Sequence, residues 1–168
     1  IAAGHVAGVA TQGDWLDGGA GADVLVGATT ADVLNGGGGS DVIVGGGGAD
    51  TLLGDVGFAP VGLNWSTTET IAGGARTRNF FGMNGGPTDA PDGSGDALYG
   101  GGGNDFAMAG AGDDAVYGDE GDDFLQGEGG SDTLSGGDGV DELLGDGTPA
   151  ATQPHGSDTL DGGGGNDK

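Results

Sequence analysis

The stretch GGGGSDVIVGGGGADTLLGD, residues 36–55, carries two opposing signals. Glycine loses more backbone entropy on folding than any other residue, and acidic side chains repel one another, so this composition resists folding. Between the glycines, however, the triplets Val-Ile-Val (42–44) and Thr-Leu-Leu (51–53) are typical of short strands. The chain can be ordered only if such triplets recur regularly.

The composition of the whole chain excludes several classes of protein. The chain has 168 residues, of which 46 are glycine, and its formal net charge is −24. Such a charge argues against nucleic acids and anionic membranes as partners. Cysteine is absent, which excludes a disulfide framework and thiolate metal sites. No apolar run approaches the roughly 18 residues of a membrane-spanning helix, so we expect no membrane span.

Aspartate recurs with a period of nine residues. The aspartates in phase are Asp14, Asp23, Asp32, Asp41 and Asp50, then Asp96, Asp105, Asp114, Asp123, Asp132 and Asp141, and finally Asp158 and Asp167. Two positions after nearly every one lies an apolar residue, as at Leu25, Ile43 and Leu134. This periodicity predicts a repeat fold and makes disorder a minor alternative.

The repeating unit is G-G-x-G-x-D-x-U-x, where U is a large apolar residue, and Gly18–Val26 matches it at every position. With this unit the sequence resembles the RTX (repeats-in-toxin) family of secreted bacterial proteins, whose calcium-binding nonapeptide has this form. The resemblance covers 13–57, 93–147 and 156–168. It implies an all-β fold, a right-handed parallel β-roll (β-solenoid), in which successive strands alternate between two sheets and two units make one coil of about 18 residues.

The chemistry of the unit favours calcium. Glycine turns can aim several carbonyl oxygens at one point, and the aspartate adds a carboxylate. Calcium accepts six to eight hard oxygen ligands, whereas the turns offer zinc or copper neither sulfur nor imidazole. The resemblance implies that each ion lies between units n and n+2. The expected pairs are Asp23–Asp41, Asp96–Asp114, Asp105–Asp123, Asp114–Asp132 and Asp123–Asp141, whereas pairs of Asp32 are weaker because Ala28, Thr29 and Thr30 replace glycines of its turn.

We therefore expect several calcium ions, about five to nine, and no other cofactor. The expected metal-binding residues are Gly18, Gly19, Gly21, Asp23, Asp32, Gly36, Gly37, Gly39, Asp41, Gly45, Gly46, Gly48, Asp50, Asp96, Gly100, Gly101, Gly103, Asp105, Gly112, Asp114, Gly118, Asp119, Gly121, Asp123, Gly127, Gly130, Asp132, Gly136, Gly139, Asp141, Asp158 and Asp167. No catalytic residue is expected, because thirteen equivalent aspartates indicate a repeated ion site.

The apolar seam formed by the U residues is narrow. At roughly 25 cal/mol per Å² its burial is unlikely to offset the ordering entropy of so much glycine. We therefore expect ion binding to be coupled to folding.

Two segments break the period: an insertion at 58–92 and a shorter loop at 148–155. They divide the chain into a lead-in (1–12), a first roll block (13–57), a second block (93–147) and final partial repeats (156–168). Thr68, Thr70 and Ile71 of the insertion, followed by Arg76 and Arg78, suggest a hairpin or an extended excursion that packs on the roll or contacts a partner.

The outward-facing positions leave two interpretations open. Val24, Val26, Val42 and Val44 face outward on one sheet, Tyr99 and Tyr117 are expected to stack, and so are Phe106, Met108 and Phe124. These residues either reflect strand preference alone, or belong to faces that the insertion or another chain covers.

The leading functional prediction is a non-enzymatic, extracellular calcium-binding structural module of a large secreted or surface RTX protein. The alternative is the calcium-triggered tail of a secreted hydrolase or toxin, and ice binding is disfavoured because no regular threonine row exists. Neither end shows a polar capping unit, so end-to-end or lateral self-association is a further expectation.

Overall fold

The computed structural model describes residues 13–55, 93–146 and 156–168, together with the backbone of four strands between 58 and 85. All elements in these ranges are β-strands. In the part of the chain that is described, no helix is long and apolar enough to cross a bilayer. Our expectations for 1–12 and for the loop 148–155 lie outside the described residues.

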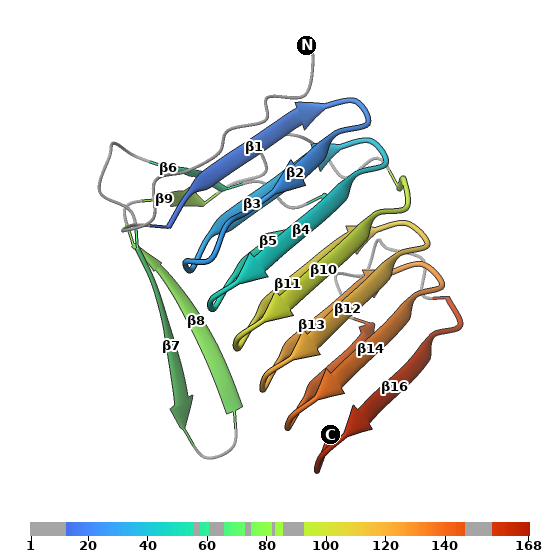
Figure 1. The fold of residues 1–168 in the computed structure, drawn as a ribbon. Helices are drawn as coiled ribbons and strands as arrows, with labels where there is room; N and C mark the ends of the chain where they lie inside the picture. Colours follow the sequence, from blue (N-terminus) through green and yellow to red (C-terminus); the bar gives the residue numbers. More distant parts are fainter. Residues whose placement is uncertain are drawn as a thin grey trace.

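Twelve strands form two parallel six-stranded sheets (Figure 1). The first sheet has the order β1-β3-β5-β11-β13-β15, and the second has the order β16-β14-β12-β10-β4-β2. Consecutive strands therefore alternate between the sheets, which confirms the predicted parallel β-roll. The strands are β1 (Trp15–Ala20), β2 (Val24–Val26), β3 (Val33–Gly38), β4 (Val42–Gly47), β5 (Thr51–Leu53), β10 (Ala97–Gly102), β11 (Phe106–Ala111), β12 (Ala115–Glu120), β13 (Phe124–Gly129), β14 (Thr133–Asp138), β15 (Glu142–Asp146) and β16 (Thr159–Gly164).

The strand register continues unchanged across both interruptions. Within a block the partners are 18 residues apart, as in the pairing of Leu16 with Leu34. Across the interruptions Leu52 pairs with Ala107 and Leu134 with Leu160, at separations of 55 and 26 residues. These separations exceed 18 by 37 and by 8, which are the lengths of the segments 56–92 and 148–155. The roll therefore continues as though neither segment were present.

The core is the seam of U residues between the two sheets. The residues Leu34, Ile43, Leu52, Leu98, Val116 and Leu125 are fully buried there. Only one large side chain per unit enters the seam, because strand residues point alternately inward and outward. At the last described strand the seam opens, and Leu160 is 50% exposed.

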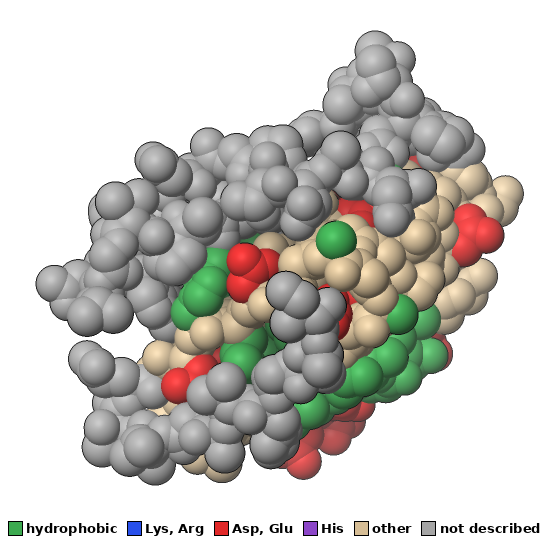
Figure 2. Space-filling view, turned by 90° about the horizontal axis from the view of Figure 1, so that it is seen from above, with side chains coloured by type: hydrophobic (Ala, Val, Ile, Leu, Met, Phe, Trp, Pro, Cys, Tyr) green, Lys and Arg blue, Asp and Glu red, His purple; other side chains and the backbone are tan. Residues whose placement is uncertain are grey.

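The outward faces of the two sheets differ. On the second sheet Val24, Val26 and Val42 are 55%, 40% and 39% exposed, so the described residues leave them open. On the first sheet the outward-facing Val33 and Leu53 are fully buried. Figure 2 shows hydrophobic side chains gathered in a band along the described surface, beside acidic ones. At these positions the outer face of the first sheet is thus more buried than that of the second, and cover of the valines by another chain stays a prediction.

Aromatic ladders run along both outer faces. The rings of Tyr99 and Tyr117 stack with centroids 5.0 Å apart, and those of Phe106 and Phe124 stack at 5.1 Å. These distances follow the spacing of neighbouring parallel strands, about 4.8 Å. The predicted stacking of both pairs is confirmed.

The insertion contains two antiparallel strand pairs. Strand β6 (Phe58–Pro60) pairs with β9 (Met83–Gly85), and β7 (Ser66–Ala72) pairs with β8 (Ala75–Phe81). The β7–β8 pair places Glu69 opposite Arg78, and its ribbon stands beside the roll in Figure 1. The predicted hairpin is confirmed, whereas the side-chain contacts of the insertion lie outside what the structure describes.

Candidate calcium sites

The repeat aspartates lie in two rows, one along each edge of the roll. Edge 1 is the row of Asp23, Asp41, Asp96, Asp114, Asp132 and Asp158, and edge 2 is the row of Asp14, Asp32, Asp50, Asp105, Asp123, Asp141 and Asp167. Each row sits where the chain crosses from one sheet to the other, because each repeat aspartate from Asp14 to Asp158 directly precedes the first residue of a strand, as Asp41 precedes β4 and Asp50 precedes β5. Units n and n+2 are therefore neighbours along one edge, as the family resemblance implies.

One hydrogen bond recurs along both rows. The backbone N–H of each aspartate donates to Oδ1 of the next aspartate on the same edge, as from Asp23 to Asp41 at 2.8 Å and from Asp105 to Asp123 at 2.8 Å. This bond fixes the carboxylate between two stacked turns and leaves Oδ2 for another partner. All five expected aspartate pairs are neighbours in these rows.

The second carboxylate oxygen faces a small cradle at the first glycine of its own turn. Asp23, Asp96 and Asp132 are buried, and Oδ2 of each accepts no hydrogen bond. At Gly18 an added Cβ would lie 3.0 Å from Asp23 Oδ2 and 2.5 Å from the carbonyl oxygen of Gly36 in the next turn. The same arrangement recurs at Gly45, Gly100, Gly118 and Gly136. Each cradle is thus empty of side chain and bounded by carboxylate and carbonyl oxygens.

These oxygens fit calcium. A buried carboxylate oxygen without a hydrogen-bond partner is costly unless a cation or a proton neutralises it. No group of three or more histidine, cysteine or acidic side chains converges on one point in the described ranges, so backbone carbonyls would provide most ligands. Calcium accepts such mixed oxygen shells with variable geometry, whereas magnesium requires a stricter octahedron.

Burial shifts the acidity of the edge 1 aspartates. Loss of water around the carboxyl groups raises the pKa of Asp96 to about 8, that of Asp114 to about 7 and that of Asp132 to about 6. Hydrogen bonds from the backbone oppose this shift, and the charges of neighbouring aspartates add to it. Without a cation the folded roll therefore disfavours the ionised form of these groups.

Two turns depart from the pattern. In the turn before Asp32, the Ala28 N–H donates to Oδ2 at 2.7 Å and the Thr30 hydroxyl donates to Oδ1 at 3.2 Å, so both carboxylate oxygens have donors. In the turn before Asp114, Ala109 replaces the first glycine and is fully buried. Its methyl group takes the place that is open in the cradles.

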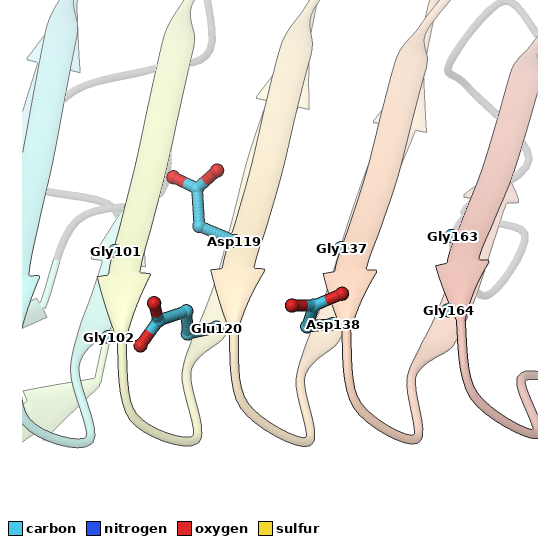
Figure 3. A pocket seen from close by; sticks show the side chains of 8 residues that line it. All are labelled: Gly101, Gly102, Asp119, Glu120, Gly137, Asp138, Gly163 and Gly164. Carbon is cyan, nitrogen blue, oxygen red and sulfur yellow. The ribbon is translucent and has the colours of Figure 1, made fainter.

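The second and fourth glycines have a backbone role. They have positive φ, as at Gly37 (100°) and Gly39 (117°), and an added Cβ there would collide with a carbonyl group of the preceding stacked turn. The second position of another turn holds Asp119, with φ of 74°. Its side chain is exposed, beside an open depression that Glu120 and Asp138 also line (Figure 3). The structure does not bring Asp119 to a cradle.

Sequence reasoning did not find the pairs that span the interruptions. The structure adds Asp41–Asp96, Asp50–Asp105, Asp132–Asp158 and Asp141–Asp167. It also buries Asp55, which is 1% exposed. The sequence contains a signal for the pairs that span 56–92 and for the place of Asp55. Gly54-Asp55 and residues 93–96 together make the six residues of one turn, which the inserted segment divides.

Comparison with protein families agrees with this geometry. The family model of the RTX calcium-binding nonapeptide repeat (4 copies) matches residues 11–32, 26–58, 92–125, 117–147 and 155–168. The chain belongs to the RTX calcium-binding repeat family, and it is a calcium-binding repeat module. Neither the curated proteins nor the solved structures give a match.

Proposed function

We propose that this chain is an extracellular structural module that folds into its β-roll when calcium fills the cradles along its edges. The observation that carries the proposal is the repeated buried Oδ2 atom beside a glycine cradle, as at Asp23 and Asp96. In the calcium-free roll these carboxylates are desolvated and lie near one another, which opposes folding. Bound calcium would neutralise these carboxylates, so that their burial would favour folding.

Membership of the RTX family supports a location outside the cell. Extracellular calcium modules bind the ion at about 10⁻⁴ to 10⁻³ M, a concentration found outside cells and not in the cytoplasm. A chain with this dependence would stay unfolded until export and fold afterwards.

Circular dichroism tests the proposal directly. In a chelator the spectrum should be that of coil, and millimolar calcium should convert it to β structure. Magnesium at the same concentration is the control, and it should have little effect because it gives up its water ligands reluctantly. A β spectrum that the chelator leaves unchanged would refute calcium-coupled folding.

A further inference from the structure

The turn that 56–92 interrupts is assembled from two separate pieces of chain. The Gly54 N–H donates to the Met108 carbonyl at 2.9 Å, and the Asp55 N–H donates to the Ala109 carbonyl at 2.9 Å. The strand register therefore persists up to Asp55. On the other side of the interruption, Asp96 accepts the N–H of Asp41 at 2.8 Å. The residues that flank the segment 56–92 on both sides are thus hydrogen-bonded to neighbouring turns.

The cradle of this turn spans the interruption. In the uninterrupted turns the first glycine and the aspartate are five residues apart, but here the pair is Gly54 and Asp96. An added Cβ at Gly54 would collide with Asp96 Oδ2 and with the carbonyl oxygen of Ala109. Asp96 is 4% exposed, and this Oδ2 accepts no hydrogen bond. The buried Asp96 Oδ2, which follows the segment 56–92, therefore faces Gly54, which precedes that segment.

Asp55 brings a further carboxylate to this place. It occupies the second position of its turn, as do Asp119 and Asp146 in theirs, but those two side chains are exposed whereas Asp55 is 1% exposed. An added Cβ at Gly110 would lie 2.7 Å from the Asp55 Cβ, so the absence of a side chain at Gly110 makes room for Asp55. The charge of Asp55 is also among those that raise the pKa of Asp96 and of Asp114.

We propose that a calcium ion in the cradle between Gly54 and Ala109 ties together the two ends of the segment 56–92, and that Asp55 makes this cradle the tightest on edge 1. The inference rests on the proposed function. Calcium affinity rises with the negative charge around a site. Because no three acidic side chains converge in the described part of the chain, Asp55 contributes its charge to the site while carbonyl oxygens supply further ligands.

The consequence is that this ion closes a long loop. Closing a loop of several tens of residues carries an entropy cost, which in other proteins a disulfide can offset. The chain has no cysteine, so an ion held by both ends is the available cross-link. The base of the insertion would then form only with calcium, together with the roll.

The test compares Asp55→Asn with Asp119→Asn, which removes the same charge at the same position of an uninterrupted turn. Calcium titration of the whole chain by calorimetry should show the tightest binding event weakened about 3–10-fold in D55N and changed less than about twofold in D119N. In chelator the effect should reverse: D55N should show at least as much β signal in circular dichroism as the original chain, because a buried like charge has been removed.

The outcomes separate the two proposals. If the original chain binds no calcium, the proposed function fails and this inference fails with it. If the chain folds with calcium but D55N titrates like D119N, only the inference is overturned. If D55N folds at no calcium concentration, Asp55→Glu decides: binding within about threefold of the original supports a role of charge, and loss of binding overturns it.

Discussion

The backbone N–H of Asp41 donates a 2.8 Å hydrogen bond to Oδ1 of Asp96, although 55 positions separate the two residues. The same bond joins Asp23 to Asp41, which are 18 positions apart. The hydrogen bond between neighbouring aspartates of edge 1 is therefore the same within a block and across the 37-residue segment 56–92. The turns on either side of the excursion form a single row of candidate ion sites, and this continuity determines which substitutions should matter.

Filling a cradle should weaken calcium binding. Gly36→Ala would place a methyl group against Asp41 Oδ2, at a position without positive φ, so the effect would be on the cradle and not on backbone strain. We expect the calcium midpoint of folding to rise about tenfold, because a ligand oxygen would have to move. The control is Gly47→Ala, where the nearest atom would be 3.7 Å away and the change should be neutral or slightly stabilising. Equal midpoints for the two variants would contradict the cradle.

Opening a cradle should add a site. Ala109→Gly removes the methyl group that stands where other turns have their first glycine. We expect equilibrium dialysis to show about one more bound calcium ion per chain. Ala111→Gly, in the third position of the same turn, is the control: it should cost the same roughly 0.5–1 kcal/mol of backbone entropy without adding an ion. Identical stoichiometry in the two variants would show that Ala109 does not block a site.

The calcium-free roll should be most stable in acid. Burial raises the pKa of Asp96 from 3.8 to about 8 and that of Asp114 from 3.8 to about 7. Between pH 3.8 and about 8 the folded chain therefore binds more protons than the unfolded chain. This contribution to the free energy of unfolding is fully present below pH 3.8 and is lost as the pH rises to about 8. In chelator, the chain is expected to be coil near neutral pH, and its β signal in circular dichroism should increase as the pH is lowered from 8 to 5. Calcium affinity should rise over the same interval, because the ion displaces protons. A β signal in chelator that rises with pH would contradict the burial of these groups.

A seam residue should matter more than an outward-facing one. Leu134→Ala in saturating calcium should lower the free energy of unfolding by about 2–5 kcal/mol, because Leu134 is buried between the sheets. Val42→Thr keeps the β-branched shape on the exposed face and should change it by less than about 0.5 kcal/mol. Urea denaturation measures both values. A larger loss for V42T would mean that another molecule or segment covers that face in solution.

Removing residues 148–155 should preserve the roll. The deletion joins Gly147 to Gly156 and restores an 18-residue spacing between Asp132 and Asp158. The shorter loop should stabilise the folded chain by up to about 1 kcal/mol. Deleting 148–157 instead leaves only Gly147 and Asp158 between β15 and β16, fewer than the three residues that join β4 to β5, and should reduce the β signal in circular dichroism. Equal spectra for the two deletions would contradict the divided-turn geometry.

The period of the aspartates predicted a repeat fold, and the family resemblance of the repeat unit predicted the two-sheet roll and its seam. Each unit folds against units one and two positions away, so contacts within a block follow from spacing alone, as for Ile43 and Leu52 across the seam. The pair Asp41–Asp96 was missed because 46 residues from Asp50 to Asp96 is no multiple of nine. The separation becomes regular once Gly54-Asp55 and 93–96 are taken as one turn.

The burial of the outer faces could not be predicted. Val42 on the second sheet and Val33 on the first occupy equivalent positions of their units, yet the first is 39% exposed and the second is fully buried. The repeat pattern is the same on both sheets, so it contains no information on which face is covered.

Both interruptions leave the roll at edge 1, between β5 and β10 and between β15 and β16, whereas the turns along edge 2 from Asp14 to Asp167 are unbroken in the described chain. The number of coils in the roll therefore does not depend on the size of the segments inserted at its edge 1 crossings. Each added coil extends the roll by about 4.8 Å, and a segment of any size can be spliced into an edge 1 crossing without disturbing the coils already stacked.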